Sequence, residues 1–136
     1  MLYDSLMSGK HQVLIIEDEA ILGESVKETL EEENYEVEWV KSGLEMWQKL
    51  ETFVPQIILL DIMLPGGEDG FTLLKELKTL GSKFEKTPVV MMTNLSQASE
   101  MSRAMDNGAV DYMIKSNVDL DKVSEVVKMT LFKYVH

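Results

Sequence analysis

Five short apolar runs recur along the chain, and longer segments with the spacing of amphipathic helices separate them. The runs are Val13–Ile16, Val37–Val40, Ile57–Leu60, Val89–Met92 and Tyr112–Ile114. Each run has the length of a β-strand, and four of them lack the alternating polar side chains of a half-exposed strand. The pattern therefore predicts a parallel sheet with helices on both faces. Glu38 interrupts the second run, which predicts that this strand lies at an edge.

The segments between the runs predict five helices, because apolar side chains recur there at helical spacing. The positions are Leu22, Val26, Thr29 and Leu30; Leu44, Trp47 and Leu50; Phe71, Leu74 and Leu77; Leu95, Ala98, Met101 and Met105; and Leu120, Val123, Val127 and Leu131. Ser42 and Glu45 form a capping-box pattern at the start of the second helix. We therefore expect one α/β domain over residues 11–136, with residues 1–10 as a disordered end or a cloning remnant.

Charge and composition exclude several classes of function. Thirteen Lys and Arg stand against 24 Asp and Glu, and the resulting net charge of −11 repels nucleic-acid phosphates and anionic lipids. No apolar run approaches the roughly 20 residues of a membrane span, so we expect a cytoplasmic protein without membrane or nucleic-acid contact. The chain has no cysteine, so any metal must be bound by oxygen or by its two histidines.

Polar side chains follow four of the predicted strands. Glu17 and Asp18 follow the first strand, Asp61 the third, Thr93 the fourth and Lys115 the fifth. In open parallel sheets, ligands bind beyond the carboxyl ends of the strands. We therefore expect carboxylates, a hydroxyl and an ammonium to gather at one edge of the sheet.

Each of these residues also has a structural explanation when it is taken alone. Glu17 and Asp18 precede a helix, where acidic side chains cap amides, and Thr93 could begin the helix that follows it. Lys115 could be an ordinary surface lysine. Asp61 is different, because a carboxylate at the end of a buried strand is costly to desolvate unless it is paired or binds a cation. A cluster of carboxylates without a cation would also be repulsive.

Taken together, the set indicates phosphoryl transfer. Two carboxylates can bind Mg²⁺, which readily recruits phosphate oxygens. An aspartate that attacks phosphorus forms an acyl phosphate, and the cation and a lysine offset the charge on the transferring oxygens. A nearby hydroxyl can donate a hydrogen bond to the new phosphoryl group.

Over about residues 11–132, the chain closely resembles the receiver domain of two-component response regulators. The resemblance rests on Glu17–Asp18, on the stretch from Leu60 to Gly66 (LDIMLPG), on Thr93, and on the stretch from Asp111 to Lys115 (DYMIK). It implies a flavodoxin-like, doubly wound (βα)5 fold with a five-stranded parallel sheet in the order 2-1-3-4-5.

The resemblance also implies a role for each acidic residue of the set. Asp61 would accept a phosphoryl group from the phosphohistidine of a histidine kinase. Asp18, Asp61 and the backbone carbonyl of Met63 would bind Mg²⁺, and Glu17 would assist through a water molecule.

The remaining site residues would act on the phosphoryl group or report it. Thr93 would contact that group and Lys115 would pair with it. Tyr112 would swing inward as the 95–105 helix and its loop rearrange, although Tyr112 can also be interpreted as an amphipathic ring at a strand edge. Thr93 and Tyr112 are thus the expected switch residues.

Three features depart from the family pattern. The turn over residues 65–70 is one residue longer than usual, so we expect a more mobile loop. Asn94 replaces a small residue and could narrow access to Asp61. Ser116 replaces a proline, so we expect a trans peptide bond between Lys115 and Ser116.

The leading hypothesis is a phosphorylation-operated binding module that catalyses only its own phosphorylation and dephosphorylation. Its partners would be a sensor histidine kinase or phosphotransfer protein and a downstream effector or output domain. Phosphorylation would switch the face formed by the 95–105 helix, the 112–114 strand and the 120–131 helix. The chain would be a single-domain regulator, or a part of a longer regulator or hybrid kinase. We expect a monomer, with weak pairing after phosphorylation.

Two alternatives remain open. One is a small flavodoxin-like enzyme, either a flavin carrier or an aspartyl phosphatase. Acids after the first strand would repel a flavin phosphate, and Glu17–Asp18–Glu19 lacks the Asp-x-Asp arrangement usual in the phosphatases. The other alternative is a receiver-like adaptor that binds partners without phosphorylation.

Overall fold

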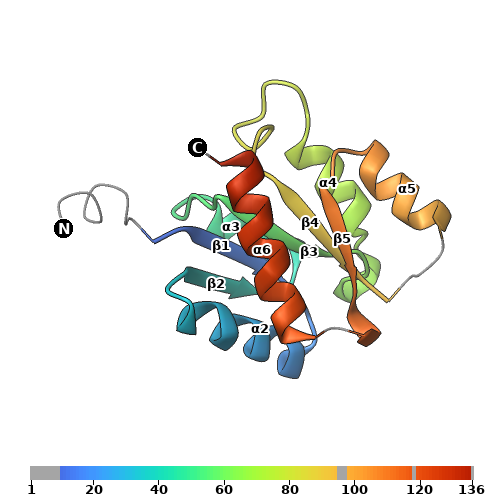
Figure 1. Cartoon of the computed structure of the whole chain (residues 1–136). Helices are drawn as coiled ribbons and strands as arrows, with labels where there is room; N and C mark the ends of the chain where they lie inside the picture. Colours follow the sequence, from blue (N-terminus) through green and yellow to red (C-terminus); the bar gives the residue numbers. More distant parts are fainter. Residues whose placement is uncertain (1–9, 95–97, 118, 136) are drawn as a thin grey trace.

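Five parallel strands form the sheet at the centre of the molecule (Figure 1). The computed structural model describes residues 10–94, 98–117 and 119–135. The strands are β1 (Gln12–Ile16), β2 (Glu36–Val40), β3 (Ile57–Asp61), β4 (Val89–Thr93) and β5 (Asp111–Ile114). Their order is β2-β1-β3-β4-β5, which confirms the predicted fold and the predicted edge position of the second strand.

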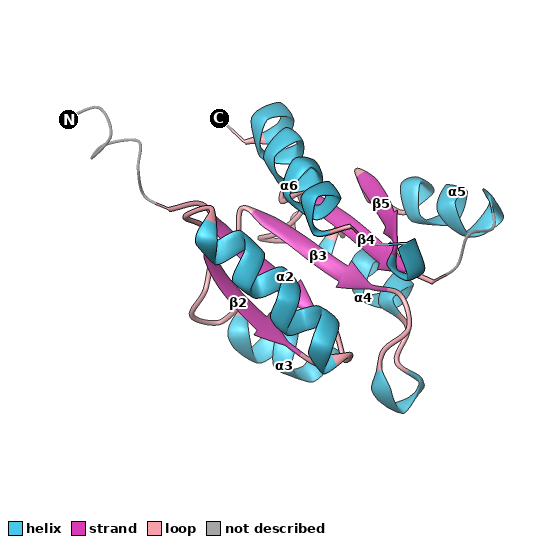
Figure 2. Cartoon of the chain, turned by 60° about the horizontal axis from the view of Figure 1, so that its bottom comes forward, coloured by secondary structure: helices cyan, strands magenta, loops and turns pink. Residues whose placement is uncertain are grey.

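Helices cover both faces of the sheet. They are α2 (Ala20–Glu32), α3 (Gly43–Lys49), α4 (Gly70–Leu77), α5 (Ala98–Asp106) and α6 (Leu120–Tyr134). Figure 2 shows α2 and α6 on one side of the sheet and α3 and α4 on the other. The helix α5 lies on the same side as α3 and α4, because its Ala104 belongs to their core cluster. Short 3-10 turns, η1 (Pro65–Gly67) and η2 (Lys115–Asn117), follow β3 and β5.

The apolar runs fill two core layers because successive side chains of a strand point to opposite faces of the sheet. Val13 and Ile15 of β1 pack in the cluster that includes α2 and α6. Leu14 and Ile16 pack in the cluster that includes α3, α4 and α5. All four side chains are fully buried, so both faces of the central strands need apolar residues, and the sequence shows continuous apolar runs.

Strand register brings the predicted site residues to one edge of the sheet. Ile16 pairs with Leu60, so Glu17 and Asp61 follow at the same level. Asp61 pairs with Met92, and Thr93 pairs with Ile114, the residue before Lys115. The carboxyl ends of β1, β3, β4 and β5 therefore meet at this edge.

The loop between β3 and α4, which we expected to be mobile, is anchored by several contacts. The amide of Leu64 donates to the carbonyl of Glu68 at 3.2 Å, and Met63 and Asp69 form an antiparallel bridge. The amide of Gly43, at the start of α3, donates to the Glu68 carboxylate at 2.6 Å. The extra residue therefore lies in a turn that is tied both to its own base and to a neighbouring helix.

Three further expectations concern the chain outside the sheet. The predicted disordered end falls on residues 1–10, of which 1–9 lie outside the described residues. The peptide bonds of the described residues are trans, including the bond between Lys115 and Ser116, as predicted. Among the helices that the structure describes, none combines the length and the apolar character that crossing a membrane requires.

Candidate functional site

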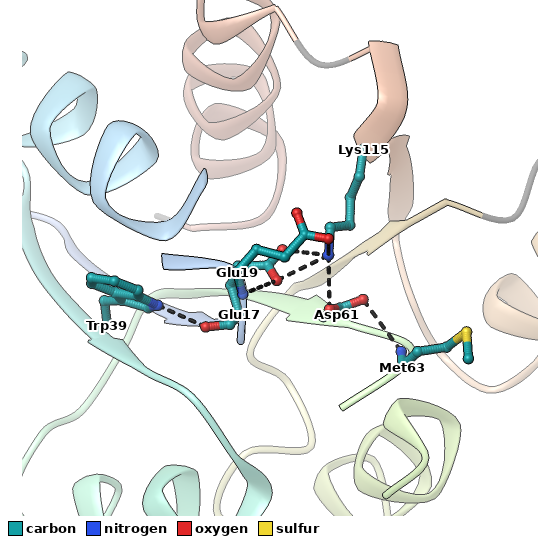
Figure 3. A network of polar contacts seen from close by, with 6 residues as sticks. All are labelled: Glu17, Glu19, Trp39, Asp61, Met63 and Lys115. Carbon is teal, nitrogen blue, oxygen red and sulfur yellow. Dashed lines mark hydrogen bonds and ion pairs between the residues drawn. The ribbon is translucent and has the colours of Figure 1, made fainter. Parts of the chain in front are cut away.

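Lys115 lies at the centre of a cluster of carboxylates (Figure 3). Its Nζ is 2.8 Å from Oε1 and 2.9 Å from Oε2 of Glu17, and 3.0 Å from Oδ2 of Asp61. A third carboxylate, that of Glu19, lies 3.4 Å from the same nitrogen. One ammonium thus joins the ends of β1, β3 and β5.

The cluster is buried, and burial shapes its acid–base properties. The exposed fraction is 0% for Glu17 and 3% for Asp61, and only 5% for the side chain of Lys115. Burial raises the pKa of Glu17 to about 7, although the hydrogen bond from Lys115 opposes this change. Burial likewise raises the pKa of Asp61. Burial alone would lower the pKa of Lys115, but hydrogen bonds to Glu17 and Asp61 raise it instead.

Backbone amides hold the carboxylates in place. The amide of Glu19 donates to Oε2 of Glu17 at 3.0 Å, and the amide of Met63 donates to Oδ1 of Asp61 at 3.3 Å. The side chain of Met63 is directed away from the cluster, and the residue is 67% exposed (Figure 3). The structure therefore connects Met63 to Asp61 through its amide, whereas the role predicted for its carbonyl stays a prediction.

Three carboxylates could bind a cation at this edge. Oxygens of Glu17, Asp18 and Asp61 all lie within 4.8 Å of one another. Oxygens on opposite sides of a bound Mg²⁺ are about 4 Å apart, so small side-chain movements would bring this set into range. Glu17 and Asp61 are buried and Asp18 is exposed, so the set combines two carboxylates held in the protein interior with one that faces solvent. Its all-oxygen chemistry fits Mg²⁺.

The two predicted switch residues occupy different settings. Thr93 is 3% exposed at the end of β4, next in the chain to Met92, the strand partner of Asp61. Tyr112 on β5 is half-buried and packs against the core cluster of α3, α4 and α5. Asn94 is exposed directly after Thr93. The structure therefore brings Thr93 to the edge that carries Asp61, while Tyr112 lies on the face covered by α5.

Two long side chains, those of Trp39 and Lys115, make contacts with Glu17 that were not predicted from the sequence. The indole Nε1 of Trp39 donates to the backbone carbonyl of Glu17 at 2.8 Å. Lys115 pairs with Glu17 as well as with Asp61. Both contacts depend on the reach of a long side chain from one strand to another, which spacing along the chain does not reveal.

A comparison with known protein families gives a match that covers most of the chain. The family described as response regulator receiver domain matches residues 13–128. Response regulator RppA of Synechocystis sp. is 35% identical over 106 residues, which are 76% of this chain and 44% of RppA. The phosphate regulon transcriptional regulatory protein PhoB of Rhizobium meliloti is 33% identical over 104 residues, 76% of this chain and 45% of PhoB. The chain thus spans about half the length of the curated relatives it matches.

Solved structures show the same likeness in three dimensions. A two-component response regulator from Clostridium difficile has a TM-score of 0.83 and 26% identity, with 93% of this chain and 100% of that chain covered. The receiver domain of a signal transduction histidine kinase from Syntrophus aciditrophicus has a TM-score of 0.80 and 29% identity, with 93% of each chain covered. The sequence comparisons and the structure comparisons therefore point to the same kind of protein.

Proposed function

The chain belongs to the response regulator receiver domain family, a family of signalling domains, and we propose that it is the phosphoacceptor of a two-component or phosphorelay system. In this proposal Asp61 accepts a phosphoryl group from a phosphohistidine of a histidine kinase or phosphotransfer protein. The contact between Asp61 and Lys115, 3.0 Å long and buried among carboxylates, carries the proposal.

The geometry supports Asp61 as the nucleophile. Lys115 binds Oδ2 and the Met63 amide binds Oδ1, so the carboxylate is held in one orientation. A carboxylate oxygen of Asp61 would attack phosphorus while the bond from phosphorus to the donor's imidazole nitrogen breaks. The Lys115 ammonium would pair with the transferred oxygens and offset their charge, and the Thr93 hydroxyl would donate a hydrogen bond to one of them.

Glu17, Asp18 and Asp61 would hold Mg²⁺, together with the carbonyl of Met63. When bound, Mg²⁺ supplies positive charge to the phosphoryl oxygens and fixes their orientation. Glu17 would contribute through a water molecule, because its carboxylate is already bound by Lys115 and by the Glu19 amide. Asp18, the exposed member of the set, would close the site on its solvent side.

Phosphorylation would switch the face formed by α5, β5 and α6. Thr93 would move towards the phosphoryl group, and Tyr112 would turn further into the core that it already contacts. On this face α6 presents two exposed apolar side chains, Met129 and Phe132, beside the start of β5. A hollow of about 320 Å³ beside Met129 and Phe132 adds to its binding capacity.

The partners follow from the family and from the relatives. A sensor histidine kinase or phosphotransfer protein would donate the phosphoryl group, and an effector or output domain would read the switched face. Several relatives have the names of transcriptional regulators, so an output that controls transcription is part of the proposal. The domain would act in the cytoplasm, catalyse only reactions of its own phosphoryl group, and be monomeric before phosphorylation.

Intact-mass spectrometry tests the proposal. The parent protein, incubated with acetyl phosphate and Mg²⁺, should gain the mass of one phosphoryl group, and a chelator should suppress the gain. Asp61→Asn keeps the shape of the side chain but removes the nucleophile, so it should gain nothing. A parent that stays unmodified with both the small donor and a phosphorylated kinase would favour the phosphorylation-independent adaptor instead.

A further inference from the structure

Both backbone polar groups of Glu17, its amide and its carbonyl, form hydrogen bonds with β2. Its amide donates to the carbonyl of Val40 at 3.0 Å, and its carbonyl accepts the indole N–H of Trp39 at 2.8 Å (Figure 3). The pairing between β1 and β2 ends at Ile16 and Val40, so Glu17 is the first residue beyond it. The indole thus extends the hydrogen bonding between the two strands past the last paired residues.

A glycine on the neighbouring helix makes room for this indole. A Cβ atom placed on Gly23 of α2 would lie 2.2 Å from the Trp39 ring. Glycine inside a helix costs about 1 kcal/mol of stability relative to alanine. Here it allows α2 to lie directly against the tryptophan, so Trp39 is clamped between this helix and the end of β1.

We propose that Trp39 is a positioning residue for the cation site, acting through the main chain of Glu17. This inference rests on the proposed function, because it assumes that Glu17, Asp18 and Asp61 hold a divalent cation. Trp39 contacts no carboxylate in the described network; it fixes the carbonyl of the peptide that joins Glu17 to Asp18. The position of that peptide fixes the Cα atoms from which the Glu17 and Asp18 side chains extend.

The physical reason is the narrow tolerance of Mg²⁺ for ligand placement. The fully buried Glu17 carboxylate is bound by Lys115 and by the Glu19 amide, so a shift of its backbone has to move the carboxylate or break those bonds. Asp18 is exposed, and the backbone is the main constraint on its position. Groups that orient metal ligands without touching the metal typically contribute about tenfold or more to affinity.

Trp39→Phe tests the inference because it keeps an aromatic ring and removes the N–H donor. Binding of Mn²⁺, measured by electron paramagnetic resonance of the free ion, reports affinity without a tryptophan signal. We expect the dissociation constant to rise about five- to tenfold. Trp47→Phe is the matched control: Trp47 lies on α3 and packs in the opposite core layer, so its replacement should leave Mn²⁺ binding unchanged.

Gly23→Ala is an independent test from another element. Its Cβ atom would force the indole away from α2 and so weaken the bond to Glu17, although Trp39 itself is intact. We expect a rise in the Mn²⁺ dissociation constant comparable to that of Trp39→Phe. Urea unfolding of each variant identifies the conditions in which it is folded, and affinities are measured there.

Two readouts separate positioning from a purely structural role. In the parent, the indole N–H resonance of Trp39 should shift on addition of Mg²⁺, and that of Trp47 should not. In Trp39→Phe, the Mg²⁺ concentration for half-maximal phosphorylation of Asp61 should rise, while the rate at saturating Mg²⁺ stays within about twofold of the parent.

The outcomes distinguish this inference from the proposed function. Unchanged Mn²⁺ affinity in Trp39→Phe, in a parent that binds Mn²⁺ and becomes phosphorylated, would overturn the role of Trp39 and leave the proposed function standing. A parent that binds no divalent cation would overturn the cation site, and the role of Trp39 with it.

Discussion

The Nζ atom of Lys115 lies 3.0 Å from Oδ2 of Asp61, and the same nitrogen lies 2.8 Å from Oε1 of Glu17. In this arrangement one ammonium compensates two buried carboxylates. A divalent cation or a phosphoryl group bound to these carboxylates would therefore change the charge that surrounds the Lys115 ammonium. The ion pair of Lys115 with Asp61 is thus already in place before the phosphoryl transfer that we propose for Asp61.

Replacing Lys115 should destabilise the protein most strongly without Mg²⁺. Lys115→Met leaves Glu17 and Asp61 buried without their cation, and we expect a loss of about 2–4 kcal/mol in the free energy of unfolding. Lys49→Met is the control, because Lys49 pairs with Glu38 at 3.4 Å on the exposed surface and should cost less than about 1 kcal/mol. Urea unfolding with and without Mg²⁺ measures both variants.

Mg²⁺ should stabilise Lys115→Met more than it stabilises the parent, because a cation then replaces the missing ammonium. Equal stabilisation of the two proteins would show that Lys115 does not compensate these carboxylates.

The affinity for Mg²⁺ should depend on pH through Glu17. Burial raises the pKa of Glu17 from its ordinary value of 4.5 to about 7, so the folded protein favours the protonated carboxyl group. Protonation of Glu17 therefore contributes to the free energy of unfolding below pH 4.5, and this contribution is lost as the pH rises through 7. A cation competes with that proton, so Mg²⁺ affinity should increase about tenfold between pH 6 and pH 8. Calorimetric titration with Mg²⁺ at each pH measures this affinity. Glu17→Gln should bind Mg²⁺ more weakly and should lose most of this pH dependence, leaving only the part that Asp61 contributes. An undiminished tenfold change in this variant would contradict the assignment to Glu17.

The loop after β3 offers a test that does not touch the site. Glu68→Ala removes the acceptor of the Gly43 amide at the start of α3, and we expect a loss of about 1 kcal/mol in the free energy of unfolding. Glu68→Gln keeps an acceptor oxygen and should lose less. Amide hydrogen exchange at Gly43 should be faster in the alanine variant. Unchanged exchange and stability would mean that the contact does not anchor the loop.

Lys78 should matter for stability and not for phosphorylation. Its ammonium donates to the carbonyls of Phe84 and Glu85, at 3.5 and 3.0 Å, and to that of Thr87. Lys78→Met should cost about 1–3 kcal/mol, because these carbonyls lose a shared donor. Lys78 follows the last residue of α4, at the end of the helix opposite the Asp61 edge of the sheet, so the rate of Asp61 phosphorylation should not change. A slower rate in the folded variant would contradict this separation.

The sequence predicted the sheet and the gathering of the candidate site residues at one edge of it, because both depend on local patterns. Strands buried on two faces need continuous apolar runs, and parallel strands end at a common edge, so residues that directly follow the runs had to meet. The contacts of Trp39 with Glu17 and of Glu68 with Gly43 were missed. Each joins a side chain to a backbone group of another element, and that contact depends on register and side-chain reach. Gly23 was the available signal for Trp39, but it has meaning only once β2 is known to lie beside α2.

Trapping the acyl phosphate tests the central claim most directly. After incubation with acetyl phosphate and Mg²⁺, borohydride reduces an aspartyl phosphate to homoserine, and peptide mass spectrometry then locates the altered residue. We predict homoserine at position 61, and none in the Asp61→Asn variant. Homoserine at position 18, or a phosphoryl group retained on Thr93, with Asp61 unmodified, would contradict the assignment of Asp61 as the phosphoacceptor.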